Sequence, residues 1–173
     1  MLRSIKIFAV IFAVLSLSIL FFNVAFPLKY RKYIDVYAKQ NNLSRELVSS
    51  LIKTESRFNK DAVSPKGCKG LMQIMPSTGK WICERYFNDT FEEKMLFDPQ
   101  MNIKIGTKYL AYLFEKYQDE TTVLACYNAG EGNVQNWIAN GDALEKTQIR
   151  YDETRNYVEK VQKNKKVYKF RVY

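Results

Sequence analysis

The segment that most limits what this chain can fold into lies at its N-terminal end. No charged residue occurs from Ile7 to Phe26, and only Ser16 and Ser18 interrupt the apolar run before Phe22. Twenty helical residues at 1.5 Å each reach roughly 30 Å, which is the thickness of a bilayer's hydrocarbon core. The run therefore predicts a membrane-spanning helix, and the compact part of the protein has to come from the residues that follow it.

A cleaved secretory signal is the alternative, because Arg3 and Lys6 precede the run. The apolar region of a signal is usually about 7 to 15 residues long and leads to a small-x-small cleavage site. Here the run is longer, and it ends in Asn23, Val24, Ala25, Phe26 and Pro27. We interpret residues 1–28 as an uncleaved anchor and residues 29–173 as one folded domain.

Charge counting does not decide which way the anchor is oriented. Lys29, Arg31 and Lys32 follow the run and weigh against Arg3 and Lys6 under the positive-inside rule. The expected placement of the domain outside the cytoplasmic membrane depends instead on the chemistry inferred below.

The chain is basic, with 27 Lys and Arg against 18 Asp and Glu and a net charge of +9. Such a surplus favours anionic surroundings such as nucleic acid, lipid headgroups or a cell wall. The basic residues are scattered apart from a concentration in 160–171, and no nucleic-acid-binding motif accompanies them. We expect no nucleic-acid partner.

The cysteines and the absence of histidine argue against a metal site. The chain has no histidine, and Cys68, Cys83 and Cys126 are an odd number without CxxC spacing. A structural zinc site or a Cys/His nucleophile is therefore not expected, and no cofactor is predicted. We expect three small, partly buried thiols, with a Cys68–Cys83 disulfide as the alternative in an oxidising compartment.

The remaining pattern is that of a mainly α-helical single domain, and an apolar fraction of 47% is enough for its core. Residues 59–69 are rich in helix breakers and are predicted to be a loop, and 70–75 to be a short strand or an irregular wall. Helical spacing and cap residues predict helices over about 29–40, from Ser44 onward, over 76–87, from Asp98 and Pro99 onward, from Thr121 or Thr122 to Gly130, over 134–139 and over 153–165.

One acidic residue falls where the helix after Ser44 should present an apolar one. Glu55 follows Ile52 at a spacing of three on the stripe formed by Leu47, Val48, Leu51 and Ile52. Burial and a nearby helix C-terminus both raise the pKa of a carboxyl, as a general acid near neutral pH requires. By spacing alone, a carboxylate neutralised by a lysine or arginine is the alternative.

Four short segments then follow one another along the chain. They are Glu55-Ser56-x-Phe58, Gly70-Leu71-Met72-Gln73-Ile74-x-Pro76, Tyr127-Asn128-Ala129-Gly130 and Glu153-Thr154-Arg155-x-Tyr157-Val158. In this order they resemble the lytic transglycosylase family, whose catalytic domain has a goose-lysozyme-like fold and is the domain of the soluble lytic transglycosylases. The resemblance covers residues 33 to about 160.

The resemblance implies that Glu55 is the single catalytic residue. It would protonate the glycosidic oxygen between N-acetylmuramic acid and N-acetylglucosamine in peptidoglycan, and then act as base on the muramic acid's own C6 hydroxyl. This closes a 1,6-anhydro ring without water, so that a second carboxylate is not needed.

The resemblance also implies the substrate contacts. Ser56 would position the reacting groups, Met72 and Gln73 would line the sugar subsites, and Tyr127, Asn128 and Tyr157 would close the cleft. Glu153 is expected to be a buried structural or orienting carboxylate, Leu71 and Ile74 to be core residues, and Gly70 and Gly130 to serve backbone geometry.

The sequence departs from the family's pattern in two ways. Cys68, Cys83 and Cys126 stand where alanine is common, and Arg150 stands where a proline often precedes Tyr151. Because Cys126 adjoins Tyr127, its oxidation is expected to disturb the cleft.

Two other functions remain open at this point. A goose-type lysozyme on the same fold would use water and a second carboxylate such as Asp61, and a wall-binding scaffold would use the cleft without catalysis. The sequence does not distinguish wall turnover, sporulation, or wall opening for a secretion or conjugation machine as the process served.

Overall fold

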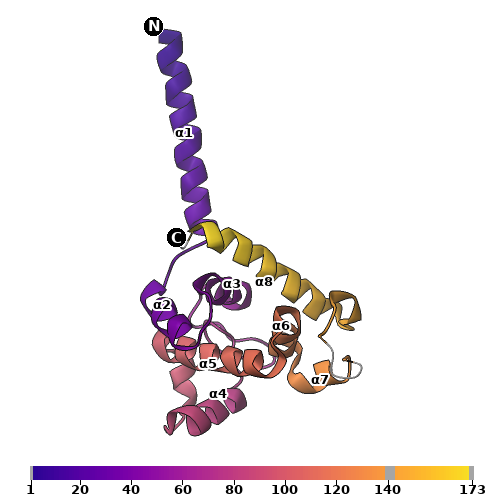
Figure 1. Ribbon diagram of the computed structural model, residues 1–173. Helices are drawn as coiled ribbons and strands as arrows, with labels where there is room; N and C mark the ends of the chain where they lie inside the picture. Colours follow the sequence, from indigo (N-terminus) through magenta and orange to yellow (C-terminus); the bar gives the residue numbers. More distant parts are fainter. Residues whose placement is uncertain (1, 139–142, 172–173) are drawn as a thin grey trace.

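A long helix, α1 (Leu2–Ala25), projects from a body that the rest of the described chain forms (Figure 1). The computed structural model describes residues 2–138 and 143–171. Within this described part, the stretch Lys6–Ala25 is the helix long and apolar enough to cross a membrane, and it is not buried against the body. The predicted N-terminal helix is therefore present, and its length and composition suit a membrane span.

The first two helices of the body begin and end close to the predicted residues. They are α2 (Arg31–Gln40) and α3 (Arg45–Ser56). Ser44 caps α3 as predicted, its side-chain oxygen accepting a hydrogen bond from the backbone N–H of Leu47 at 3.3 Å. The apolar stripe of α3 is buried in the core, with Leu51 and Ile52 fully inaccessible to solvent.

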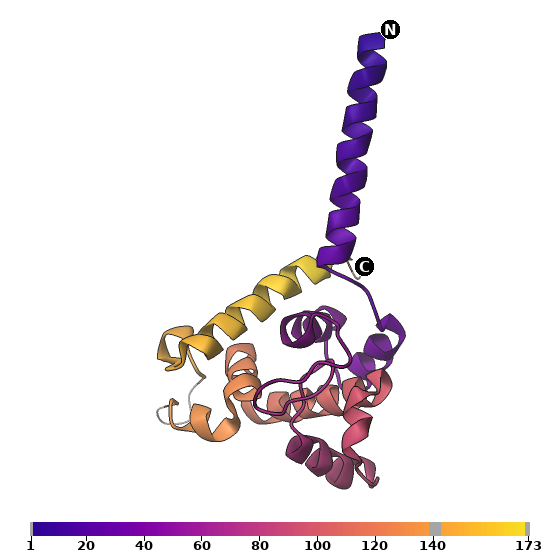
Figure 2. The same ribbon diagram turned by 180° about the vertical axis from the view of Figure 1, so that it is seen from behind.

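Between α3 and α4 (Pro76–Ile82) the chain forms an irregular wall rather than a strand. Two isolated antiparallel bridges, Val63 with Lys69 and Lys69 with Ile74, fold it back on itself. Seen from behind in Figure 2, this segment loops between α3 and α5 (Pro99–Tyr117). Of the two predicted possibilities for 70–75, the irregular wall is confirmed.

Asn102 in the first turns of α5 fastens this wall to the body. Its buried amide donates to the carbonyls of Lys69 at 3.0 Å and Leu96 at 2.8 Å, and its oxygen accepts from the N–H of Met72 at 2.7 Å. Gly70 packs so closely here, with φ +75°, that a Cβ would lie 2.0 Å from the Leu96 oxygen. The predicted backbone role of Gly70 follows from this contact.

The other helices confirm most predicted boundaries and correct three. Asp98 caps α5, as predicted, by accepting from the N–H of Met101 at 2.8 Å. Helix α6 begins at Glu120 rather than at Thr121 or Thr122. The remaining elements are η1 (Cys83–Phe87, a π turn that continues α4), η2 (Glu93–Phe97), α6 (Glu120–Ala129), α7 (Glu131–Gln135), η3 (Lys146–Gln148) and α8 (Asp152–Arg171).

Each correction has a physical cause. Asp119 is the cap of α6, accepting from the N–H of Thr122 at 2.7 Å, so the helix starts one residue after Asp119. The short helix predicted at 134–139 is instead α7, which starts after the turn at Gly130 and ends at Gln135. Residues 136–138 are not helical, and residue 139 lies outside the described residues. Helix α8 extends past Lys165 because Tyr168 is buried against the body.

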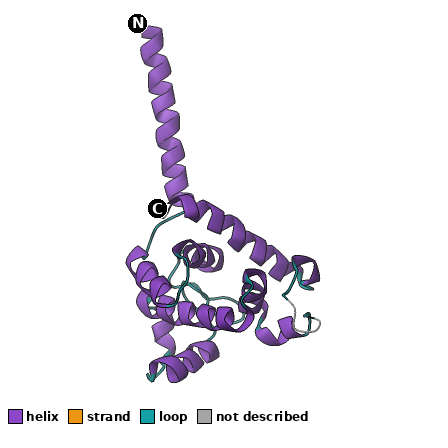
Figure 3. Cartoon of the chain, in the orientation of Figure 1, coloured by secondary structure: helices purple, strands orange, loops and turns teal. Residues whose placement is uncertain are grey.

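Helix α3 lies at the centre of the body. It packs against α8 along one side and α2 along another, while α5 contacts α2, α4 and α6, and α6 contacts α8. Figure 3 shows helices joined by loops, with no strand in the described ranges. The predicted mainly α fold is confirmed, and Cys68, Cys83 and Cys126 are free thiols rather than a disulfide pair.

Candidate active site

Glu55 stands in the last turn of α3, where the helix meets a pocket of about 260 Å³. Its carboxyl is partly buried. The pocket is formed by the loop after α3, the irregular wall, the end of α6 and the start of α8. Its other lining residues are Ser64, Pro65, Lys66, Cys68, Gln73, Tyr127, Asn128 and Glu153.

The surroundings of Glu55 keep its carboxyl protonated up to neutral pH. Burial raises the pKa of Glu55 to about 7, although the hydroxyl of Tyr157 opposes this by donating to Oε1 at 2.7 Å. Among the residues that the structure describes, no lysine or arginine forms an ion pair with Glu55. The neutralised-carboxylate alternative is therefore wrong, and the group is suited to act as a general acid.

Two tyrosines flank this acid and stay protonated themselves. Burial, together with the charge of Glu55, raises the pKa of both Tyr127 and Tyr157 well above the ordinary value. The Tyr127 hydroxyl donates to the Met72 carbonyl at 2.9 Å, and its ring packs 5.3 Å from that of Tyr109. Tyr127 lines the pocket, whereas Tyr157 is buried, is not among the lining residues, and reaches the site through its bond to Glu55.

Asn128 and Gln73 line the pocket and are held by neighbours. The Asn128 side-chain oxygen accepts from the Thr154 hydroxyl at 2.9 Å. The Gln73 amide donates to the carbonyls of Ala62 at 3.1 Å and Gly70 at 2.9 Å, at a residue whose φ is +48°. The structure therefore brings Gln73, Tyr127 and Asn128 together with Glu55, as predicted.

Met72, predicted to line the sugar subsites, and Ser56, predicted to position the reacting groups, both face the core rather than the pocket. The Met72 side chain is fully buried and packs against Gly106 on α5, where a Cβ would lie 2.5 Å from its sulfur. The buried Ser56 hydroxyl donates to the carbonyls of Ile52 at 3.1 Å and Leu71 at 2.8 Å. Both residues support the site from behind, because they face the core.

The two acids considered beside Glu55 also differ from expectation. Glu153 is not buried: its side chain is 77% exposed at the rim of the pocket, 4.0 Å from the Lys66 ammonium. Asp61, the suggested second carboxylate, is 62% exposed, pairs with Lys60 and does not line the pocket. Among the carboxyls that line the pocket, Glu55 is therefore the one whose pKa is raised by burial.

Ser64, Pro65, Lys66 and Cys68 complete the pocket and were not predicted to do so. The available signal was the predicted loop at 59–69, which lies directly between the acid and the irregular wall. Cys126, by contrast, is fully buried, and burial raises the pKa of its thiol to about 12. The thiol exposed to the cleft is that of Cys68.

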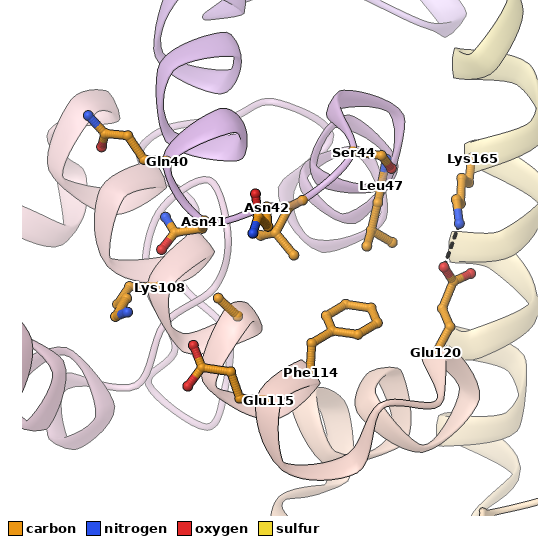
Figure 4. A pocket seen from close by; sticks show the side chains of 12 residues that line it. Gln40, Asn41, Asn42, Ser44, Leu47, Lys108, Phe114, Glu115, Glu120 and Lys165 are labelled. Atoms are coloured by element: carbon orange, nitrogen blue, oxygen red, sulfur yellow. Dashed lines mark hydrogen bonds and ion pairs between the residues drawn. The ribbon is translucent and has the colours of Figure 1, made fainter.

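No group of three or more metal-ligating side chains gathers anywhere in the described part of the chain. A larger hollow of about 490 Å³ lies at the opposite end of α3, beside Ser44 and Leu47 (Figure 4). There Glu120 pairs with Lys165, so that carboxylate is neutralised as an ion pair.

A helical body whose pocket holds a carboxyl of raised pKa beside buried tyrosines is the arrangement expected of a lysozyme-like protein. The family model described as the transglycosylase SLT domain matches residues 32–150, and the chain belongs to this family. The predicted resemblance is thereby confirmed.

Curated relatives and solved structures agree with this assignment. The soluble lytic murein transglycosylase of Escherichia coli (strain K12) is 34% identical over 143 residues, which are 79% of this chain and 22% of that protein. The membrane-bound lytic murein transglycosylase C of Edwardsiella ictaluri is 32% identical over an alignment of 174 residues, which covers 80% of this chain and 46% of that protein.

The structure of an inactive variant of the lytic transglycosylase Slt from Pseudomonas aeruginosa superposes with a TM-score of 0.79 at 30% identity. The match covers 85% of this chain and 25% of that one. This chain thus spans less than half the length of the relatives it matches.

Proposed function

We propose that this protein is a membrane-anchored lytic transglycosylase that cleaves the glycan strands of peptidoglycan. Residues 1–28 would be the anchor and 29–173 the catalytic domain. The observation that carries the proposal is the carboxyl of Glu55, partly buried in the pocket with a pKa of about 7. Family membership and the names of the relatives support the substrate class.

The reaction needs one acid that also serves as a base. Glu55 gives its proton to the glycosidic oxygen as the bond from that oxygen to C1 of N-acetylmuramic acid breaks. The C6 hydroxyl of the same sugar then forms a bond to C1 and returns a proton to Glu55, so the enzyme is regenerated and no water is consumed. A nucleophile within the substrate has an effective concentration that bulk water does not match.

The lining residues have separate parts in this proposal. Tyr157 orients the Glu55 carboxyl, while Tyr127, Asn128 and Gln73 form the walls that hold the sugar. The carboxyl of Glu153, at the rim of the pocket, differs from that of Glu55 because it is exposed to solvent. Ser56 and Met72 position the wall rather than touch the glycan, because both are buried.

The substrate also decides the sidedness in this proposal. Peptidoglycan lies outside the cytoplasmic membrane, so the catalytic domain is placed on the cell-wall side of a single-pass anchor. The relatives named as membrane-bound support an association with the membrane.

A goose-type lysozyme is the second candidate, and Glu153 is the observation that favours it. It lines the same pocket as Glu55 and would be the second carboxyl that a water-using enzyme needs. Asp61 has no such position. A non-catalytic scaffold has less support, since a binding cleft gains nothing from a carboxyl whose burial raises its pKa.

Product analysis tests the proposal. Purified sacculi are digested in oxygen-18 water and the muropeptides are weighed by mass spectrometry, with Glu55→Gln as the inactive control. We expect 1,6-anhydro ends without oxygen-18. Reducing ends that carry oxygen-18 would show that the protein is a lysozyme.

A further inference from the structure

The base of α1 is packed against the body instead of being joined to it by a free linker. The ring of Phe26 meets the ring of Tyr168 edge to face, with 5.7 Å between centroids. The Tyr168 hydroxyl donates to the carbonyl of Pro27 at 3.1 Å, and its side chain is fully buried. The tip of α8 therefore lies where the anchor leaves the body.

Further contacts attach both α8 and α3 to this base. The Arg171 guanidinium donates to the Asn23 side chain at 2.6 Å and lies 5.1 Å from the ring centroid of Phe22. The Lys53 ammonium lies 5.7 Å from the ring centroid of Phe26. In both Figure 1 and Figure 2 the end of α8 stands beside the base of α1.

Phe170 stands out at this tip. Its side chain is 85% exposed, more than any other large hydrophobic residue among those whose exposure is described, those on α1 included. It lies between Lys169 and Arg171. An exposed aromatic ring flanked by cations is typical of a residue at a membrane–water interface.

Four cations lie at the end of the body from which α1 leaves, and we call them the basal cations: Lys29, Lys53, Lys169 and Arg171. Lys29 follows Pro27 closely, and Lys169 adjoins Tyr168, so all four belong to the same end of the body. Ten ion pairs occur in the described chain, and none of them includes a basal cation. Of the four, Lys29 and Lys169 are exposed, so their charge is available to an outside partner.

We infer that Phe170 and the basal cations form a surface that binds acidic phospholipid headgroups, with the Phe170 ring inserted at the interface. The inference rests on the proposed membrane span of α1, because that span brings this end of the body to the bilayer. Cations close to an anionic surface are attracted within a Debye length, and an aromatic ring adds apolar contact.

This surface would set the height of the catalytic cleft above the membrane. Tyr157, which contacts Glu55, and Tyr168, which contacts the anchor, are on one helix and about 17 Å apart at 1.5 Å per residue. A domain held at both α1 and Phe170 cannot swing freely about the anchor. Its substrate would then be glycan strands close to the membrane.

The test places a fluorescent ring at the tip of α8 in the full-length protein. The Phe170→Trp variant is reconstituted in phosphatidylcholine vesicles with and without phosphatidylglycerol, containing lipids brominated near the headgroup end of the acyl chains. Tyr151→Trp is the matched control, since Tyr151 is 49% exposed just before the other end of α8. The unchanged protein gives the background of Trp81 and Trp137.

We expect the emission added by Phe170→Trp to be quenched by bromine, more strongly with phosphatidylglycerol, and that added by Tyr151→Trp to be unquenched. Equal quenching of the two would overturn the inference. Flotation of the vesicles separates this result from a failure of the anchor, in which the protein would not float with lipid at all.

A charge test completes the design. In the Phe170→Trp background, replacing Lys29 and Lys169 by glutamine should remove the extra quenching that phosphatidylglycerol causes. Replacing Lys80 and Lys94, two exposed lysines at or near α4, by glutamine makes the same change in charge. This control should leave the extra quenching intact. The headgroup assignment is wrong if both pairs behave alike.

Discussion

Tyr157 on α8 donates a 2.7 Å hydrogen bond to the carboxyl of Glu55 at the end of α3, although the two residues are 102 positions apart in the chain. The bond favours the ionised carboxyl, whereas burial favours the protonated form and has the larger effect. Their balance places the pKa of Glu55 at about 7. A proton can therefore leave and return near neutral pH, as the proposed two-step reaction requires.

The pH dependence of the rate should follow this balance. Since the first step needs the protonated acid, activity should fall as the pH rises through about 7. Tyr157→Phe removes the bond that lowers the pKa of Glu55, so the fall should move to higher pH. The measurement is a pH–rate profile on purified sacculi.

Tyr127→Phe is the control for this profile. It also loses a hydroxyl from the cleft, but that hydroxyl donates to the Met72 carbonyl and not to the acid. Its profile should keep the midpoint of the unchanged protein. A Tyr157→Phe profile with an unmoved or lowered midpoint would contradict the role given to the bond.

Replacing the acid should abolish catalysis without loss of the fold. Glu55→Gln cannot transfer protons, so we expect the rate to fall by about 10² to 10⁴ or more. The measurement is the release of soluble muropeptides, with circular dichroism to check the fold. Asp61→Asn, at an exposed acid outside the pocket, should leave the rate nearly unchanged.

The same substitution should change how stability depends on pH. The pKa of Glu55 is raised in the folded protein, so the carboxyl contributes stability fully below pH 4.5 and loses that contribution as the pH rises through about 7. Glu55→Gln should therefore be more stable relative to the unchanged protein at pH 8 than at pH 4. Thermal unfolding of both proteins at pH 4 and at pH 8 measures this difference in stability. If the difference is the same at the two pH values, the pKa of Glu55 is not raised in the folded protein.

Gly70 should be intolerant of any side chain. In Gly70→Ala the Cβ would lie 2.0 Å from the Leu96 oxygen and 2.3 Å from the Asn102 nitrogen at a φ of +75°, so we expect loss of more than about 4 kcal/mol. Gly67→Ala shares the positive φ but has open space around it, and should cost about 1 to 2 kcal/mol. Thermal unfolding of the two variants measures the difference, and similar losses would show that the close packing is unimportant.

Alkylation should distinguish the three thiols. Cys68 lines the pocket, whereas Cys83 and Cys126 are buried, and burial raises the pKa of both. A bulky maleimide should react first at Cys68 and block the cleft, so activity should fall with one label per chain. Cys68→Ala should keep its activity under the same treatment, and inactivation of this variant would place the sensitive thiol elsewhere.

The proposed anchor predicts how the protein behaves on extraction. The exposed apolar surface of Lys6–Ala25 should keep it with membranes through a high-salt or alkaline wash. Cell fractionation and N-terminal sequencing check this. A chain that begins near Phe26 in the soluble fraction would identify α1 as a cleaved signal.

The sequence by itself determined the features that depend on neighbouring residues. Glu55 was found because helical periodicity assigns a face to each position, and Ser44 and Asp98 because capping acts within three residues. The family followed from four short segments in order, since each is a local pattern. Local patterns do not choose between neighbouring residues that could each begin a helix. The start of α6 was therefore predicted at Thr121 or Thr122, although Asp119 is its cap.

Only the tertiary structure decided which side of each segment faces the cleft. In the irregular wall no period of 2 or 3.6 assigns faces, so adjacent residues such as Met72 and Gln73 separated into core and pocket through contacts with α5. Glu153 is exposed, and Tyr157 meets Glu55, because α8 crosses α3 in one particular way. The pKa of Glu55 likewise depends on how deeply that packing buries it, which is set by residues far away in the chain.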